Sequence, residues 1–322
     1  MPKSLTALLL AWIFLLSPRQ SWAVTIDWSP VGNPGNSADS TGFGAVGYAY
    51  KIGTYDVTNS QYVEFINTKD PNGSNALGLY NSNMANATFG GINFNAGNPS
   101  GGKYTVISGA QNHPVNSVTW YDSIRFANWV NNGQGNGDTE TGAYTLLGGT
   151  PTPSNGLSIT RNAGATVFLP SENEWYKAAY YDPGSHSYFQ YPTSSNVSPT
   201  GSGPTAAANH ANIFPGGPNN LTDVGAYTGT TSPYGAFDMG GNVFQWNESL
   251  LFTTFRGARG GSFVMTSSDL LSSHQDSQSP RIADLLIGFR VASTPEPSTG
   301  LLALLAGGTL WWWRKRFIRR AR

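Results

Sequence analysis

Three segments of the chain combine a helix-start signal with apolar residues at helical spacing. Thr58 and Gln61 form a capping box, in which a hydroxyl residue precedes a glutamine by three positions. Tyr62, Phe65 and Ile66 then fall on one helix face at i, i+3 and i+4. The same combination occurs twice more, at Thr119 with Asp122 and at Ser171 with Glu174. The pattern therefore predicts three amphipathic helices.

Short apolar runs between these helices predict strands. The runs cover residues 48–53, 144–147, 166–170 and 288–292. Residues 69–112 and 182–230 are rich in Asn, Gly, Ser, Thr and Pro, which is typical of long loops. We find no internal repeat and no linker between residues 45 and 293. The expected fold class is a single, loop-rich α+β domain.

Composition narrows the possible functions. The chain has 322 residues, of which 39% are hydrophobic and 13% aromatic, so it has enough apolar material for a large core. Its net charge is zero and no basic stripe is present, so we expect no nucleic-acid partner. There is no cysteine, which excludes disulfides, thiolate metal sites and thiol nucleophiles.

The first residues have the pattern of a secretory signal. Lys3 precedes an apolar run over residues 5–16, and Ser21 and Ala23 offer a small-x-small cleavage site. We expect residues 1–23 to be a signal peptide and residues 24–44 to lead into the domain. A retained membrane anchor is the alternative, which the short apolar run disfavours.

Residues 294–322 form a second targeting pattern. Pro295, Glu296 and Pro297 precede an apolar segment over residues 299–313, and six Arg or Lys residues follow Trp313. This order resembles the PEP-CTERM sorting signal of Gram-negative bacteria; the alternative is an amphipathic tail. The resemblance implies export, temporary retention in the inner membrane, processing by an exosortase, and a place in the cell envelope or extracellular matrix alongside an exopolysaccharide system.

Six ordered blocks between residues 45 and 293 resemble the formylglycine-generating (sulfatase-modifying factor) enzymes. They are "YDVTNSQYVEFIN", "PVNSVTWYDSIRFANWVNN", "FLPSENEWYKAAYY", "SPYGAFDMGGNVFQWNES", "RGARGGSF" and "IGFRVA". The resemblance implies a compact α+β domain of the C-type-lectin-like kind.

The resemblance also implies calcium sites, because Ca²⁺ takes six to eight oxygen ligands that include backbone carbonyls. The family's side-chain ligands fall on Asp238 and Gln245. At the position of Gln245 the family usually has Glu. The implied carbonyl ligands are those of Met239, Gly241 or Val243, and a second site begins at Asn212 and Ile213. The alternative for residues 232–249 is a buried turn, in which Asn242 and Asp238 satisfy backbone groups and the aromatic residues fill the core.

The family's oxygenase chemistry needs two cysteines that bind Cu(I), because Cu(I) prefers sulfur ligands. In this chain, Met265 and Leu270 occupy those positions, so no copper is expected. The related non-haem iron centres need paired ligands, and none of the four histidines has a partner at i+3 or i+4. These residues are His113, His186, His210 and His274.

Two function classes follow. The first is a non-catalytic binding or structural module, with an exopolysaccharide or protein ligand. The second is a divergent metal-dependent oxidoreductase of the same superfamily. The missing metal ligands favour the first class.

Overall fold

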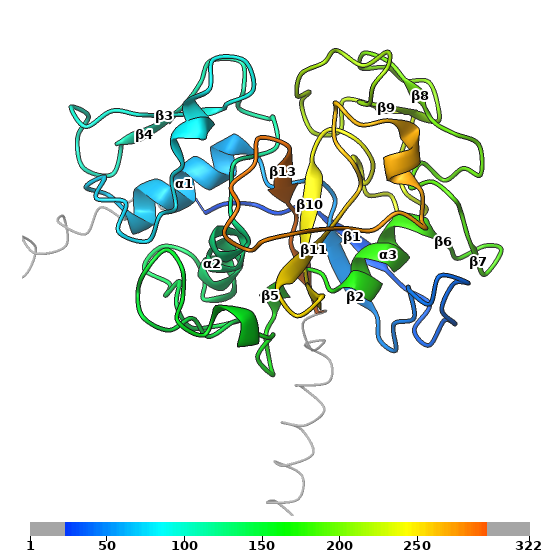
Figure 1. Ribbon diagram of the computed structural model, residues 1–322, viewed down its shortest axis with the longest axis horizontal. Coiled ribbons are helices and arrows are strands. Elements are labelled where there is room, and N and C mark those ends of the chain that lie inside the picture. Colours follow the sequence, from blue (N-terminus) through cyan, green and yellow to red (C-terminus); the bar gives the residue numbers. More distant parts are fainter. Residues whose placement is uncertain (1–22, 295–322) are drawn as a thin grey trace, which may run out of the picture.

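A computed structural model describes residues 23–294 of the chain (Figure 1). The expected signal peptide, except for Ala23, lies outside the described residues. The sorting residues Pro295, Glu296 and Pro297 and the segment that follows them also lie outside. Within residues 23–294, no helix is both long and apolar enough to cross a membrane.

All three predicted helix starts are confirmed. Each helix begins directly after its predicted cap, and each cap shows the reciprocal hydrogen bonds of a capping box. Because these bonds satisfy backbone N–H groups that a helix leaves free, they fix where each helix begins. The helices are α1 (Asn59–Lys69), α2 (Trp120–Asn131) and α3 (Glu172–Tyr180).

Two four-stranded sheets form the centre of the fold, with α2 on one side and α3 on the other (Figure 1). The first sheet is antiparallel and has the order β1 (Trp28–Val31), β2 (Tyr50–Gly53), β14 (Ala292–Ser293), β5 (Val167–Phe168). The second has the order β12 (Asp276–Gln278), β11 (Phe255–Arg259), β10 (Phe244–Leu251), β13 (Ile287–Phe289). The expected lead-in therefore supplies strand β1.

The two predicted loops contain short elements. Residues 69–112 hold η1 (Ser82–Ala85) and the pair β3 (Ile92–Phe94) and β4 (Tyr104–Val106). Around residues 182–230 lie β6 (Tyr181–Asp182), β7 (Ser187–Tyr188), β8 (Thr200–Gly201) and β9 (His210–Ala211). Two further 3₁₀ turns are η2 (Gly156–Ser158) and η3 (Ser267–Leu270). The remainder is irregular, so the α+β, loop-rich expectation is confirmed.

The predicted strand at residues 144–147 is wrong. This segment is irregular because a side chain takes the place of a neighbouring strand. The Asn128 amide oxygen accepts a hydrogen bond from Tyr144 N at 2.7 Å, and its Nδ2 donates to Tyr144 O at 3.0 Å. A buried amide can satisfy backbone groups as a strand does.

The predicted strand at residues 288–292 is divided between the two sheets. β13 pairs with β10 in parallel, whereas β14 pairs with β2 and β5. Arg290 and Val291 lie in between, where the chain passes from one sheet to the other. This crossing places the Arg290 side chain, which is fully buried, at the junction of the sheets.

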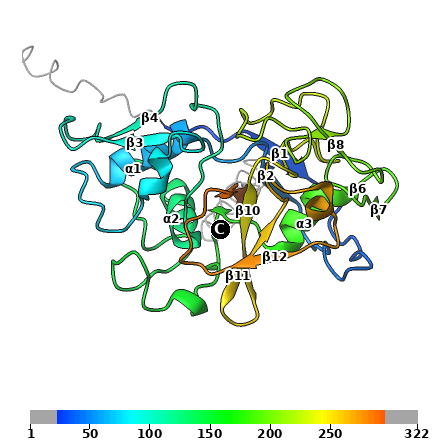
Figure 2. The same cartoon turned by 45° about the horizontal axis from the view of Figure 1, so that its top comes forward.

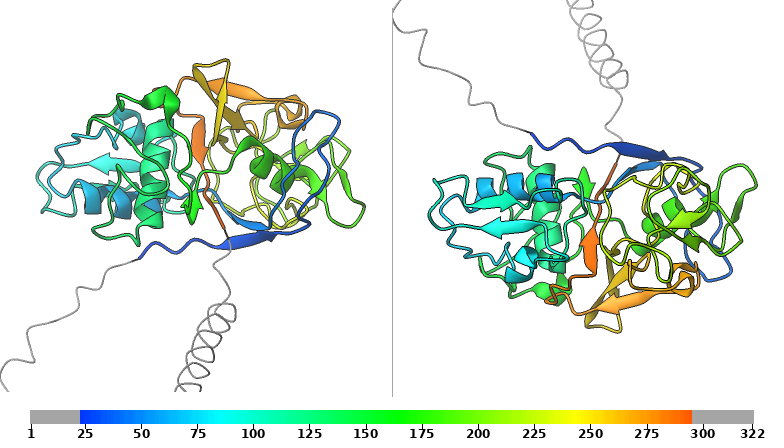
Figure 3. Two further views of the ribbon diagram at one scale, coloured as in Figure 1. Left: turned by 90° about the horizontal axis from the view of Figure 1, so that it is seen from below. Right: turned by 90° about the horizontal axis from the view of Figure 1, so that it is seen from above.

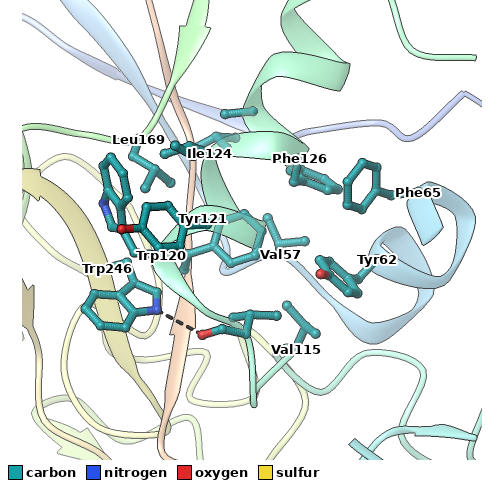
Figure 4. Close-up of a cluster of buried hydrophobic side chains, with 14 of the residues drawn as sticks. Val57, Tyr62, Phe65, Val115, Trp120, Tyr121, Ile124, Phe126, Leu169 and Trp246 are labelled. Carbon is teal, nitrogen blue, oxygen red and sulfur yellow. Dashed lines mark hydrogen bonds between the residues drawn. The ribbon is translucent and has the colours of Figure 1, made fainter. Parts of the chain in front are cut away.

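Aromatic rings fill the larger core (Figure 4). The Phe126 ring lies 5.4 Å from the rings of Phe65 and Phe289, measured between centroids. Trp246 Nε1 donates to Val118 O at 3.1 Å, so its polar end is satisfied as well. These contacts join α1 and α2 to the second sheet.

The β10–β11 hairpin projects from the body of the molecule (Figure 2). Two views show it on the face opposite the one from which both ends of the described chain leave (Figure 3). β1 and β14, which lie near the start and the end of the described chain, both pair with β2. The first sheet thus marks one face of the molecule and the hairpin marks the other.

Candidate functional site

The glycine-rich segment before β10 is held in place by its own polar side chains. Asp238 Oδ2 accepts a hydrogen bond from Gly225 N at 2.6 Å, and burial raises the pKa of this carboxyl. Asn242 Oδ1 accepts from Thr222 N at 3.1 Å. Gly241 has φ +81, and a Cβ there would lie 2.5 Å from Asn212 O, so the turn requires glycine.

The amide of Gln245 has partners on both ends. Its Oε1 accepts from Trp175 Nε1 and from Arg290 Nε, each at 2.7 Å, and its Nε2 donates to Asp238 O at 2.7 Å. A cation could use the Gln245 or Asp238 carbonyl only after displacing these donors. The positive charge beside this amide is the guanidinium of Arg290.

The second expected calcium position adjoins the first. Asn242 N donates to Asn212 O at 3.0 Å, and Ile213 O accepts from Gly217 N at 2.9 Å. Asn212 Oδ1 is buried without a hydrogen-bond partner in the part of the chain that the structure describes, which leaves one oxygen suited to a cation. Residues 23–294 contain no group of three or more His, Asp or Glu side chains placed to hold a metal ion. Calcium binding by Asp238, Met239, Gly241, Val243, Gln245, Asn212 and Ile213 stays a prediction.

Gln245→Glu is expected to make the thermal stability depend more strongly on calcium. The new carboxylate oxygen would replace the Nε2 donor that faces Asp238 O, and two oxygens at that separation repel each other without a bridging cation. A ligand that binds only the folded state stabilises it by mass action. Melting should be followed with calcium and with chelator, using Gln111→Glu as an exposed control. The calcium hypothesis fails if chelator shifts neither the natural chain nor the variant and no calcium co-purifies.

Met265 and Leu270, which the resemblance places at the family's copper positions, lie in apolar packing. Leu270 is fully buried in a cluster with Tyr191, Ala211 and Ile213. Met265 is half-buried and packs against the larger core. His274 Nε2 lies 3.8 Å from Asp269 Oδ1. No thiolate is available here, because the chain has no cysteine.

A pocket of about 510 Å³ lies beside the β10–β11 hairpin. This volume is in the range of small-molecule sites, about 300–1,000 Å³. Four separate segments line it: Tyr121 at the start of α2, residues 153–158 including η2, Thr254 in the hairpin turn, and residues 279–281 after β12. A Cβ on Gly156 would lie 2.3 Å from the Tyr121 hydroxyl, so this glycine lets the hydroxyl approach the loop.

The hairpin turn beside the pocket presents an aromatic ring to solvent. Phe252 and Thr253 have φ +48 and +63, and Thr254 N donates to Leu251 O at 3.2 Å. Positive φ at both central positions is typical of a type I′ turn, which favours Asn and Gly. A bulky and a β-branched residue here cost about 1–3 kcal/mol each. The Phe252 side chain is 80% exposed, so this strain is not offset by burial.

No motif in the sequence marks this pocket. Its lining residues carry no spacing motif. The Pro, Ser and Gly content of residues 151–158, which is typical of a surface loop, is the one signal that the sequence offers there. The turn at Phe252 and Thr253 has neither glycine nor asparagine, so no turn signal marked it.

Residues 45–295 match the family described as the Sulfatase-modifying factor enzyme 1-like domain. The chain belongs to this family. The match confirms the resemblance carried by the six sequence blocks, with nearly the same boundaries.

Two curated proteins are similar to this chain in sequence, and both are described as serine/threonine-protein kinase pkn1. The protein from Chlamydia caviae is 23% identical over 264 residues, which are 76% of this chain and 33% of that protein. The protein from Chlamydia pneumoniae is 23% identical over 210 residues, 59% of this chain and 26% of that protein. The chain thus spans about a third or less of the length of these relatives.

Two solved structures share the fold of this sulfatase-modifying-factor-like domain. Treponema denticola variable protein 1 has a TM-score of 0.55 and 17% identity, and the match covers 85% of this chain and 97% of that one. CarF has a TM-score of 0.57 and 20% identity, with coverage of 85% and 100%. The C-type-lectin-like fold expectation is confirmed by these neighbours.

Proposed function

We propose that this chain is a non-catalytic binding module whose pocket beside the β10–β11 hairpin takes an extracellular saccharide. The lining of the pocket carries the proposal. Hydroxyl and amide side chains suited to binding sugar hydroxyls dominate it, and it contains no carboxylate or histidine for general acid–base chemistry. The polar side chains are Tyr121, Ser154, Asn155, Ser158, Thr254, Ser279 and Arg281.

The alternative, a divergent metal-dependent oxidoreductase, has less support. Met265 and Leu270 are not copper ligands of the family type, and their side chains belong to apolar packing. Metal analysis of the purified protein discriminates between the two functions. Stoichiometric iron or copper would favour the oxidoreductase.

The exposed ring of Phe252 supports a binding role. The backbone at Phe252 is strained and its ring gains no stability from burial, and such strain is typical of functional sites. An aromatic ring can stack on the apolar face of a sugar, while the hydroxyls of the pocket bind its polar edge.

Replacing Phe252 with serine is expected to weaken saccharide binding at least about fivefold, equivalent to about 1 kcal/mol. A saccharide array screened with the purified protein should identify a ligand, and calorimetry should then compare the variants. Val197→Ser is the matched control, because Val197 is also an exposed apolar residue but lies outside the β10–β11 hairpin, whose Thr254 lines the pocket. Binding of no saccharide, or equal losses in both variants, would reject the proposal.

We further propose that the domain is exported and sorted as the resemblance at its C-terminus implies. The two ends of the described chain leave from the face opposite the hairpin, so an anchor at the C-terminus would leave the pocket accessible (Figure 3). The expected partners during processing are an exosortase and the inner membrane, and the mature protein would reside in the envelope or matrix.

Changing Glu296 and Pro297 to alanine is expected to make the membrane-bound form persist. Fractionation of a host with an exosortase system provides the measurement. The natural protein should appear briefly in the inner membrane and then, shortened, outside it. An uncleaved protein that stays in the inner membrane in both versions would show that the segment is an ordinary anchor.

A further inference from the structure

One charged side chain lines the pocket. Arg281 is exposed in the segment after β12, and the other lining residues are neutral. The pocket therefore carries a positive charge, although the whole chain has a net charge of zero. An uncompensated charge at a binding site attracts ligands of opposite sign.

A second guanidinium lies behind the pocket wall. The Arg256 side chain is 2% exposed, and its Nη2 donates to Ile159 O at 2.9 Å and to Gly156 O at 3.3 Å. Its Cζ lies 3.8 Å from the centre of the Trp120 ring. These contacts attach Arg256 to the loop that forms one side of the pocket.

The positive charge of Arg256 is not fully compensated by other groups of the protein. Its Nε is buried without a hydrogen-bond partner, and within residues 23–294 no carboxylate lies at ion-pair distance from it. Burial lowers the pKa of Arg256 to about 10, so the side chain remains charged at neutral pH. A buried charge without a counter-ion is costly, and an anion in the adjacent pocket would reduce that cost.

The Tyr121 hydroxyl lies within the field of both guanidiniums. Burial raises the pKa of Tyr121, while Arg281 and Arg256 both oppose this shift. The hydroxyl therefore stays neutral at physiological pH and can donate a hydrogen bond to an anion. Arg281 and Tyr121 therefore offer a charged and a neutral donor in the same pocket.

We infer that the pocket selects an acidic saccharide, with the carboxylate of a uronic acid residue bound by Arg281 and Tyr121. This inference rests on the proposed saccharide-binding function. A guanidinium pairs well with a carboxylate, a sulfate or a phosphate. A single accessible cation matches the single negative charge of a carboxylate. The surrounding serine, threonine and asparagine side chains suit the ring hydroxyls better than they suit an acidic peptide.

The test compares an oligogalacturonate with the neutral galactose oligomer of the same length, using the purified mature protein and calorimetry. We expect the acidic oligomer to bind more tightly, and its affinity to fall as salt is raised. Arg281→Gln should weaken binding of the acidic oligomer about 10-fold or more and change binding of the neutral oligomer less than about twofold. Lys51→Gln, which removes one positive charge from β2, should change neither.

Each other outcome overturns a defined part of the inference. Equal affinity for the two oligomers, or equal losses in the Arg281 and Lys51 variants, would overturn the charge selection while leaving saccharide binding intact. Binding of neither oligomer, with binding of an acidic peptide, would overturn the saccharide assignment and the proposed function. Preference for a sulfated over a carboxylated oligomer would overturn the uronate assignment alone.

Discussion

Replacing Arg290 with methionine is expected to lower the free energy of unfolding by about 3–5 kcal/mol at pH 8. The guanidinium donates to Gln245 Oε1 at 2.7 Å, to Gly53 O at 2.9 Å and to Phe237 O at 2.8 Å. Its Nη2 also lies 3.1 Å from Asp56 Oδ1, and both side chains are completely buried. Methionine would leave the acceptors unpaired and Asp56 without its counter-ion.

The loss should be smaller at pH 5 than at pH 8. Burial raises the pKa of Asp56 to about 7, although Arg290 opposes the shift. Because the folded-state pKa is raised, the folded chain binds the proton more tightly than the unfolded chain does. The stability from this proton is fully present at pH values below the unfolded pKa, about 3.9, and is lost as the pH rises towards 7. Without Arg290 the pKa would rise further, so the variant should lose additional stability between pH 5 and pH 8.

Denaturant unfolding at both pH values provides the measurement, with midpoints compared at constant slope. Arg281→Met is the matched control, because the same replacement at an exposed arginine should change stability by less than about 0.5 kcal/mol. A loss below about 1 kcal/mol, or the same loss at both pH values, would show that Arg290 does not hold the sheets together as described.

Phe126→Ala is expected to lower the free energy of unfolding by about 3–5 kcal/mol. The ring of Phe126 has no exposed surface and contacts the rings of Tyr62, Phe65, Trp129 and Phe289. Removing it would open a cavity between α1, α2 and the second sheet, since packed neighbours relax only partly. Figure 4 shows the position of this ring among its neighbours.

The same substitution at Phe252 shows how much of the expected loss of stability comes from burial of the ring. Phe252→Ala removes identical atoms from an 80% exposed position, so stability should change by less than about 0.5 kcal/mol. Thermal and denaturant unfolding of both variants give the comparison. Similar losses at the two positions would contradict the assignment of Phe126 to the core.

Local sequence determined the helices of this protein. Each capping box is a set of hydrogen bonds among four consecutive residues, so its outcome does not depend on the rest of the fold. Apolar residues at helical spacing likewise placed Tyr62, Phe65 and Ile66 in the core. The order of the six blocks was enough to predict the family and its loop-rich α+β fold, which the match over residues 45–295 confirms.

The candidate site was decided by tertiary structure. The pocket brings together Tyr121, residues 153–158, Thr254 and residues 279–281, and chain positions this far apart show no periodic pattern. Residues 144–147 are irregular because the amide of Asn128 bonds their backbone, and residues 288–292 are divided because the chain crosses between two sheets there. Sequence alone determined those features that depend on local hydrogen bonds and on apolar faces within one segment. Folding decided which distant side chains share one pocket, because contacts between distant segments form only when the whole core packs.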